Sequence, residues 1–347
     1  MTEQGTGLNR GTYPLSFCAD AAVPEGACTD TAQAPESTST ESEGRPDNWL
    51  RSCMICPRGC GADRTAGERG YCGQADEPAV SLVRLHMWEE PCISGVNGSG
   101  TVFFNGCNLH CVFCQNYQIS GRETGQTITV GRLAEIFLEL QSEHAHNINL
   151  VTPTHFAPQI IKALDIARGQ GLVIPVVYNC GGYESVETVR SLEGYVDVWM
   201  PDFKYKSAEL SARYSHAPDY FERASATLAE MVRQTQGQFE FDEHGMMRRG
   251  VLVRHLILPG QTADSKRVLR YLHETYGDSI YISIMSQFTP VGDLTAYEEL
   301  NRRLSADEYA RVVAFAESIG IRQGFIQEGD TAKESFIPQF DGKGVVK

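Results

Sequence analysis

Three cysteines, Cys107, Cys111 and Cys114, fall within eight consecutive positions of the stretch NGCNLHCVFCQN. A closed zinc site needs four ligands, and no fourth cysteine or histidine follows at a typical spacing; for His110, inside the loop, we expect an exposed side chain. A c-type haem needs CxxCH, whereas Gln115 follows the last cysteine, and a redox disulfide would leave one thiol idle. An iron–sulfur cubane held by three thiolates keeps one iron open to an outside ligand, and the odd count favours this chemistry.

Four more cysteines, Cys53, Cys56, Cys60 and Cys72, precede this loop in the stretch CMICPRGCGADRTAGERGYC. Four thiolates with a CxxC start and intervening glycines can close around Zn²⁺ or around a second cubane cluster, and spacing does not distinguish the two. Arg58 and Arg64 lie among them, where their positive charge would offset the negative charge of the thiolates. We therefore predict a second metal site, closed by protein ligands. Cys18 and Cys28 have no obvious partners, and we expect unliganded thiols there.

Composition excludes several other classes of function. The chain has 347 residues, 41% of them hydrophobic, and a formal net charge of −14 from 44 acidic and 30 basic residues. This charge argues against broad binding to nucleic acid or to anionic lipid. No stretch approaches the roughly 20 apolar residues that span a bilayer, and the N-terminus lacks the pattern of a secretory signal. Because seven of the eleven cysteines are clustered, we predict a reducing compartment and a cytoplasmic protein.

The elements that must position these cysteines follow from the apolar pattern. Residues 1–47 read as a disordered tail, 48–95 as a Cys- and Gly-rich metal-binding segment, 96–330 as the main domain and 331–347 as a C-terminal tail. Within the main domain, six short apolar runs alternate with helical stretches: TVFFNG, INLVTPT, VIPVVYN, VDVWMPD, VLVRHLILPG and IYISIMSQ. Such runs are typical of buried parallel strands.

Helix faces are marked by three groups of apolar residues and by one capping box. The groups are Leu133, Ile136, Phe137 and Leu140; Ile160, Ile161 and Leu164; and Val268, Leu269 and Leu272. Ser305 and Glu308 form the capping box that opens a last helix. We predict an α/β fold, a partial (β/α)6 TIM-like barrel, with its site at the carboxyl ends of the strands. The three-cysteine loop begins directly after the first of these strands.

CNLHCVFC resembles the CxxxCxxC signature of the radical S-adenosylmethionine (SAM) enzymes, with the aromatic Phe113 before the last cysteine. The resemblance implies a [4Fe–4S] cluster on Cys107, Cys111 and Cys114 whose open iron chelates SAM. It implies reductive cleavage of SAM to methionine and a 5′-deoxyadenosyl radical, which abstracts a hydrogen atom from a substrate. The cofactor supplies the difficult chemistry, and the protein positions and shields it. For Phe113, contact with the adenine and packing in the core are the two alternatives.

Residues 53–328 resemble more specifically the pyruvate formate-lyase activating enzyme-like proteins of the PflX type, in EEPCISGVNGSGTVFFNGCNLHCVFCQNYQIS, VTPTHF, YNCGGYES, MPDFKY and IMSQFTPVG. This implies kinship to activases of glycyl radical enzymes, which are oxidoreductases. It also implies a flavodoxin or ferredoxin as electron donor and a glycyl radical enzyme as partner. Modification of a small molecule or peptide is the enzymatic alternative. A non-catalytic iron–sulfur or zinc scaffold, or an electron carrier, is the alternative of another class. The substrate and the catalytic residues stay open.

The same resemblance nominates SAM-binding residues at the strand ends. Thr152 and Thr154 stand where activases carry a Gly-Gly-Glu-type stretch, and Asn179 stands where they carry an Asp-Thr pair. Asp202 and Lys204 retain an Asp-x-Lys pattern whose alternative is a surface ion pair. Arg254 is a charge in an apolar run, where it needs an anion; the SAM carboxylate and a nearby acid are the two candidates.

Other residues at these strand ends carry weaker predictions. For His155, capping or packing competes with chemistry. For Cys180, we expect a buried thiol or a neighbour of SAM, and for Gln287 a place facing the substrate.

Overall fold

The structure, a computed structural model, describes residues 49–121, 124–327 and 338–346. The predicted tail of residues 1–47 lies outside the described residues, together with Cys18 and Cys28. Six strands run parallel in adjacent positions, and they are the six apolar runs of the sequence. They are β2 (Ser99–Phe104), β4 (Ile148–Val151), β5 (Val176–Cys180), β6 (Val198–Pro201), β8 (Met247–Leu256) and β9 (Tyr281–Met285). The predicted α/β fold is confirmed.

The full sheet has the order β10-β9-β8-β6-β5-β4-β2-β1-β3 within the described part of the chain, with β7 (Glu240–Phe241) pairing on β8. Four of its strands, β1, β3, β7 and β10, were not predicted. β10 (Gly324–Ile326) adds a parallel strand beyond β9, and β1 (Ala79–His86) pairs antiparallel with β2. β1 lies inside the segment 48–95, which we expected to be irregular. It is a strand because Ala79, Val80, Leu82 and Val83 are buried. β3 (Gln126–Thr127) pairs antiparallel on the far side of β1.

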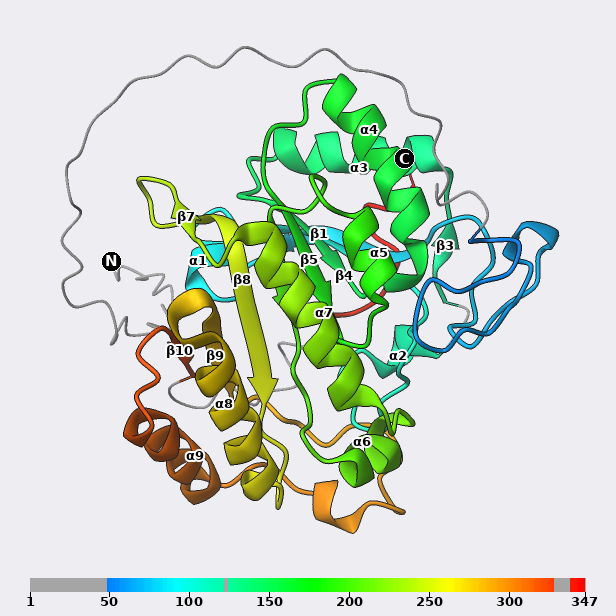
Figure 1. Cartoon of the computed structure of the whole chain (residues 1–347). Coiled ribbons are helices and arrows are strands. Elements are labelled where there is room, and N and C mark those ends of the chain that lie inside the picture. Colours follow the sequence, from blue (N-terminus) through cyan, green and yellow to red (C-terminus); the bar gives the residue numbers. More distant parts are fainter. Residues whose placement is uncertain (1–48, 122–123, 328–337, 347) are drawn as a thin grey trace, which may run out of the picture.

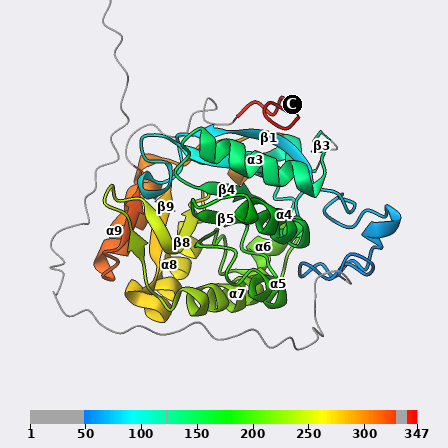
Figure 2. The same cartoon turned by 90° about the horizontal axis from the view of Figure 1, so that it is seen from above.

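Helices cover the outer face of this curved sheet, as Figure 2 shows for α3, α4, α5, α7, α8 and α9. They are α3 (Val130–Ser142), α4 (Ala157–Gly169), α5 (Val186–Ser191), α6 (Ala208–Ser215), α7 (Tyr220–Thr235), α8 (Thr262–Tyr276) and α9 (Ala306–Ser318). The short helices α1 (Pro91–Ser94) and α2 (Tyr117–Ser120) lie in the connections on either side of β2. Each strand of the six is thus followed by at least one covering helix, which is the predicted (β/α)6 arrangement.

The apolar faces that mark these helices in the sequence are the faces they bury. The predicted residues of α3, α4 and α8 are all buried against the sheet in one large core. Helix α9 begins with the predicted capping box: Ser305 Oγ accepts from the Glu308 backbone at 3.2 Å, and Glu308 Oε2 accepts from the Ser305 backbone at 3.0 Å. Such a box satisfies two backbone donors that a helix start would otherwise leave unpaired. Local signals and core packing therefore agree in each of these helices.

The end of the chain packs onto β1. The Val83 backbone N–H donates to the Lys343 carbonyl at 3.0 Å, and Arg132 Nε donates to the Val345 carbonyl at 2.9 Å. Val345 is fully buried, and Phe340 meets the ring of Phe103 edge-on. Residues 338–346 of the predicted C-terminal tail are thus part of the folded body; residues 331–337 and 347 lie outside the described residues.

The Cys-rich segment forms an irregular lobe at one side of the barrel, drawn in blue on the right of Figure 1. Between residues 49 and 78, the described regular structure is one short turn of 3-10 helix at Arg64–Ala66. Its own apolar cluster is small and consists of Leu50, Cys53 and Ile55, with Trp49 packed against it. In the described part of the chain, no helix has both the length and the apolar character needed to cross a bilayer.

Candidate functional site

The three-cysteine loop leaves β2 at the carboxyl edge of the parallel strands. Gly106 makes the turn with φ at +85°, and a Cβ there would come within 2.5 Å of the Cys72 carbonyl oxygen. Only glycine allows both this backbone conformation and this close approach. The glycine at position 106 therefore lets the start of the cysteine loop pack directly against Cys72 of the N-terminal segment.

Hydrogen bonds from several strand ends hold the loop. Asn108 Nδ2 donates to the Tyr183 carbonyl at 2.5 Å, and the Val112 backbone donates to the Tyr214 carbonyl at 2.9 Å. Gln115 Nε2 reaches the Gln287 carbonyl at 2.6 Å. These partners follow β5, β6 and β9 in the chain, so the loop is fixed across the mouth of the barrel.

The thiol groups of the loop are placed in a setting that suits a cationic partner. Burial raises the pKa of Cys111, and it raises the pKa of Cys114 to about 12, with a further contribution from the neighbouring cysteines. Ser215 Oγ donates to Cys111 Sγ at 2.9 Å, and the Leu109 backbone donates to Cys107 Sγ at 3.3 Å. Buried thiolates are costly without positive charge nearby, and an iron–sulfur cluster provides that charge. The donor set of the loop therefore fits the predicted cluster.

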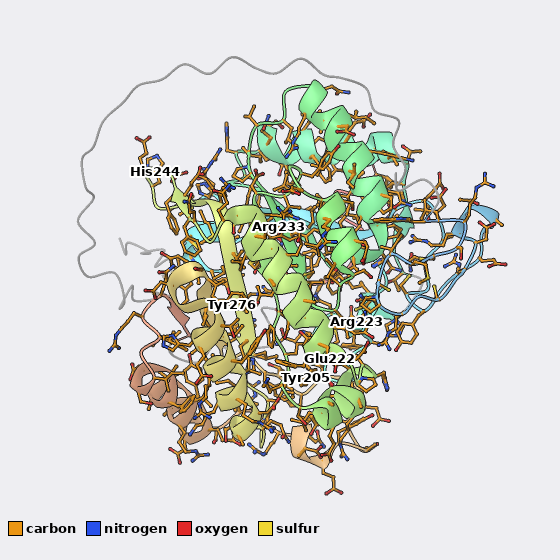
Figure 3. The ribbon with its side chains drawn as sticks, in the orientation of Figure 1. Tyr205, Glu222, Arg223, Arg233, His244 and Tyr276 are labelled. Carbon is orange, nitrogen blue, oxygen red and sulfur yellow. The ribbon has the colours of Figure 1, made fainter. Side chains whose placement is uncertain are left out.

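Ser215, which donates to Cys111, is itself hydrogen-bonded to a second hydroxyl group. Tyr205 Oη lies 2.7 Å from Ser215 Oγ, and Figure 3 labels Tyr205 beside α6. Tyr205 is buried, so this chain of hydroxyl groups fixes the donor that reaches the Cys111 sulfur.

A cavity of about 210 Å³ opens beside the loop. Its walls include side chains from the loop, from β5, β6 and β8, and from the connection after β1: Cys111, Cys114, Phe113, Asn179, Asp202, Lys204, Arg254, Glu89, Trp88 and Gln287. Of the predicted SAM-binding residues, the structure thus brings five to one cavity next to two of the three loop cysteines. Gln287 also lies on its wall.

Asp202 and Lys204 form an ion pair of 2.6 Å at the wall of this cavity. Burial alone would lower the pKa of Lys204, but Asp202 and Cys111 more than offset it and raise that pKa. Burial would likewise raise the pKa of Asp202, yet Lys204 and Arg254 bring it below its usual value. Both groups are charged at neutral pH. The side chains are 17% and 18% exposed, so the alternative of a surface pair is wrong.

Arg254 is held by a nearby acid, the second of its two predicted partners. Its guanidinium donates to Glu89 Oε2 at 3.0 Å, to Asp202 Oδ1 at 3.2 Å and to Asn179 Oδ1 at 2.6 Å. Strand register explains the meeting: Asn179 is the second-last residue of β5, and Asp202 follows β6 in a bridge with Arg254 on β8. Glu89 was missed by sequence reasoning. It stands three residues beyond the unpredicted strand β1, and the EEP stretch carries no periodic signal.

Two predicted residues lie away from the cavity wall. Thr154 is buried, and its hydroxyl donates to Glu184 Oε1 at 2.7 Å. Thr152 adopts φ of +56°, which turns the chain out of β4, and Val151 takes its place at the wall. Glu184 is fully buried, and burial raises its pKa to about 7. Thr154 thus belongs to a buried polar pair with Glu184, and Thr152 leaves the wall to its neighbour Val151.

Packing decides between the alternatives for three other residues near the site. His155 is buried, with Nε2 2.7 Å from the Asn105 carbonyl and its ring against Phe156, so its packing role is confirmed. Cys180 is a buried thiol, as expected. The expectation of an exposed His110 is wrong: its ring stacks on Tyr71 at 4.8 Å, and burial lowers its pKa.

Phe113 both lines the cavity and packs in the core, so its two predicted roles stay open. Its ring contacts Tyr214 edge-on and Phe288 at a tilt, with centroid distances of 6.5 and 6.2 Å.

The four cysteines of the lobe are all free thiols: Cys53 and Cys72 are buried, Cys56 is half-buried and Cys60 is exposed. Arg64 is buried among them and donates to the Ala75 and His155 carbonyls, while its charge acts on Cys72. Among the residues that the structure describes, no three His, Cys, Asp or Glu side chains stand in the arrangement of a single-ion site. This holds for the lobe and for the loop alike.

Comparisons with known proteins agree with this geometry. Residues 101–272 match the family model of the radical SAM superfamily. An uncharacterized protein of Methanocaldococcus jannaschii is 28% identical over 284 residues, which cover 79% of this chain and 77% of that protein.

Solved structures match at low identity. Streptococcus suis SuiB bound to S-adenosylmethionine is 9% identical with a TM-score of 0.43, covering 64% of this chain and 48% of SuiB. Methylornithine synthase (PylB) is 15% identical with a TM-score of 0.44, covering 63% of this chain and 60% of that one. HydG, a maturase of the [FeFe]-hydrogenase, is 15% identical with a TM-score of 0.44, covering 67% and 52%. The match thus spans about half the length of SuiB and HydG.

The family model covers the segment that carries the CxxxCxxC loop and the strand ends around the cavity, from β2 to α8. The cofactors of the family are a [4Fe–4S] cluster and SAM. In residues 101–272, this chain thus matches the radical SAM superfamily.

Proposed function

We propose that this radical SAM enzyme abstracts a hydrogen atom from a glycine of a partner protein and so activates a glycyl radical enzyme. One observation carries the proposal: the cavity beside the cysteine loop adjoins a second, smaller cavity. The two share Trp88, Glu89, Arg254, Met285 and Gln287, and the second extends to β10. Two adjoining cavities suit an extended polypeptide better than a compact small molecule.

Cys107, Cys111 and Cys114 would hold the cluster. When bound, the cluster chelates SAM and supplies the electron that splits it into methionine and a 5′-deoxyadenosyl radical. The buried loop keeps the three thiols oriented by its hydrogen bonds to Tyr183, Tyr214 and Gln287, and it closes one side of the cavity to water. Exclusion of water protects a radical from side reactions.

The charged wall would orient SAM. Glu89 and Asp202 carry two negative charges, and Lys204 and Arg254 carry two positive charges, so this part of the wall is balanced. Lys204 is within electrostatic range of Cys111 and Cys114, which supports a role beside the SAM carboxylate. The carboxylate oxygens of Asp202 and Glu89 are suited to accept from ribose hydroxyl groups.

The remaining predicted SAM-binding residues differ in their location. Asn179 is buried at the wall and accepts from Arg254, which supports its role as a carbonyl-type ligand or positioning group. Phe113 supports an adenine contact through its place at the wall. Thr152 and Thr154 have weaker support because neither lines the cavity.

Substrate entry would use the side bounded by the connection after β1. Trp88 is 42% exposed there and lines both cavities. A large aromatic side chain that is partly exposed beside a polar site is a common anchor for a protein partner. The electron donor would be a flavodoxin or ferredoxin, both of which transfer single electrons.

Isotope transfer tests this proposal. Reduced, reconstituted enzyme is mixed with SAM and with the glycyl radical enzyme of the same organism, produced with α-deuterated glycine. We expect one deuterium in 5′-deoxyadenosine and the electron paramagnetic resonance (EPR) signal of a glycyl radical. This signal is a doublet with unlabelled glycine and collapses to a narrow line with the labelled residue, whose remaining α-hydrogen is deuterium. The Cys111→Ala variant serves as control and should give neither. SAM cleavage without deuterium transfer and without the radical signal would reject the activase and leave a small molecule or peptide as the substrate.

A further inference from the structure

The Cys-rich lobe has little regular structure and a small apolar core of its own. Residues 49–78 contain a single described turn of 3-10 helix, and their own buried apolar cluster is limited to Leu50, Cys53 and Ile55. Segments of this size without a core usually depend on disulfides or on a bound metal. Cys53, Cys56, Cys60 and Cys72 are all free thiols, and four thiols can crosslink such a segment through a metal.

The backbone of the lobe brings its cysteines toward one another, short of the arrangement of a single-ion site. The Cys53 backbone donates to the Ala62 carbonyl at 3.1 Å, and the Gly61 backbone donates to the Cys53 carbonyl at 3.0 Å, so Cys60 lies beside Cys53. Cys60 Sγ is 4.0 Å from the Cys53 carbonyl oxygen, and Cys56 follows Cys53 by three residues.

Glycines allow the lobe to close this tightly. A Cβ on Gly70 would lie 2.4 Å from Cys60 Sγ, and Gly59, Gly61 and Gly73 all have positive φ. Each of these glycines lies next to one of the cysteines or two residues from it. Such turns are what a compact thiolate site requires of its backbone.

The lobe also contacts the loop that carries Cys107, Cys111 and Cys114. Arg58, two residues after Cys56, donates to the Asn108 carbonyl at 2.8 Å and to the Ser215 carbonyl at 3.2 Å. Its guanidinium lies 4.1 Å from the ring centre of Tyr71, which precedes Cys72. Tyr71 in turn stacks on His110.

The residues that the lobe contacts belong to the cluster loop or bond to it. Asn108 and His110 stand between Cys107 and Cys111 in the chain. Ser215, whose carbonyl accepts from Arg58, also donates its hydroxyl to Cys111 Sγ. The two lobe residues that make these contacts, Arg58 and Tyr71, are close in sequence to Cys56 and Cys72.

We propose that Cys53, Cys56, Cys60 and Cys72 hold a second, closed metal centre, zinc or iron–sulfur, which positions the SAM-cluster loop through Arg58 and Tyr71. Protein fills all four positions, so this centre binds no SAM. The side chains do not stand in single-ion geometry, so loading the site draws the thiols together and orders the lobe, because metal binding and local folding are coupled. Arg58 and Tyr71 are positioning residues, since they act through the loop backbone.

Metal analysis tests the centre itself. The triple variant Cys107→Ala, Cys111→Ala, Cys114→Ala is purified without oxygen and assayed for iron, sulfide and zinc. We expect either about one zinc per chain or about four irons with matching sulfide. The metal should be lost when Cys53→Ala and Cys56→Ala are added, and kept when Cys92→Ala is added. A triple variant with neither metal would overturn the proposal. This assay needs neither SAM nor a partner protein, so its outcome is independent of the proposed function.

A second experiment tests the connection to the loop. Arg58→Gln is compared with Arg51→Gln, an exposed arginine of the same lobe, in fully loaded protein. We expect both variants to keep all their metal. Amide exchange in residues 107–114 should be at least about tenfold faster in Arg58→Gln, and the change that SAM causes in the EPR spectrum of the reduced cluster should be weaker. Arg51→Gln should match the unaltered protein. An Arg58→Gln variant with unaltered exchange and spectrum would show that the lobe does not position the loop.

Discussion

Replacing Arg254 by methionine should destabilise the barrel strongly, because it removes the cation that holds two carboxylates at the cavity wall. Arg254, Glu89 and Asp202 are 14%, 11% and 18% exposed. Breaking an ion pair this well buried by removing one partner costs about 3–5 kcal/mol, since the other charge is left uncompensated. Asp202 keeps Lys204 at 2.6 Å, so most of the cost should come from Glu89.

A double-mutant cycle isolates that cost. Adding Glu89→Gln to Arg254→Met removes the orphaned charge, and we expect a coupling energy of about 1–3 kcal/mol between the two sites. Arg254→Lys keeps the charge but loses the planar fork that reaches three acceptors at once, so it should fall between the two. Unfolding midpoints in urea, measured at matched metal content, give these differences. A loss below about 1 kcal/mol for Arg254→Met, or no coupling to Glu89, would refute the reasoning.

The penalty should also depend on pH with a defined sign. Arg254 helps to hold the pKa of Asp202 below its usual value, so its removal raises the folded-state pKa of Asp202. A group with a raised folded-state pKa contributes stability below its unfolded pKa and loses it as pH rises through the folded value. The gap in stability between Arg254→Met and the unaltered protein should therefore be largest near pH 7 and shrink toward about pH 4, near the unfolded pKa of carboxylates. A gap that grows as pH falls would contradict this sign.

Three further changes test separate parts of the structure. Cys107→Ala, Cys111→Ala and Cys114→Ala should each abolish SAM cleavage while circular dichroism keeps the signal of a folded barrel; retained cleavage would remove that cysteine from the ligand set. Gly182→Ala should cost well over about 1 kcal/mol in urea unfolding, because its Cβ would lie 2.2 Å from the Asp202 carbonyl oxygen at φ of +79°. Gly194→Ala, at φ of +81° with no atom within 4 Å, is the matched control for backbone strain alone, and equal losses would mean that the close contact is unimportant. Ser305→Ala should cost about 1 kcal/mol by removing the cap of α9, with SAM cleavage unchanged.

Sequence reasoning succeeded where one local signal decided the structure. The buried strands are continuous apolar runs, and the α3, α4 and α8 faces repeat with the period of a helix. The register of neighbouring parallel strands places Asp202 beside Arg254. The sequence predicted an acid near Arg254 without identifying it.

Where prediction failed, the deciding contact came from distant segments. β1 lies in a Gly- and Cys-rich stretch and becomes a strand through its pairing with β2. Glu89 reaches Arg254 across 165 positions of the chain, which no local pattern reveals. Thr154 sits at a strand end, as the sequence suggested, but the buried Glu184 takes its hydroxyl. His110 is covered because Tyr71, from the lobe, stacks on its ring.

The most direct test of the radical SAM assignment is the cleavage of SAM by the reconstituted enzyme. Protein loaded with iron and sulfide is reduced in the absence of oxygen and incubated with SAM, and methionine and 5′-deoxyadenosine are quantified. We expect methionine and 5′-deoxyadenosine in equal amounts, neither product from the Cys111→Ala variant and an unaltered yield from Cys92→Ala. A fully loaded cluster that leaves SAM intact with several strong reductants would contradict it.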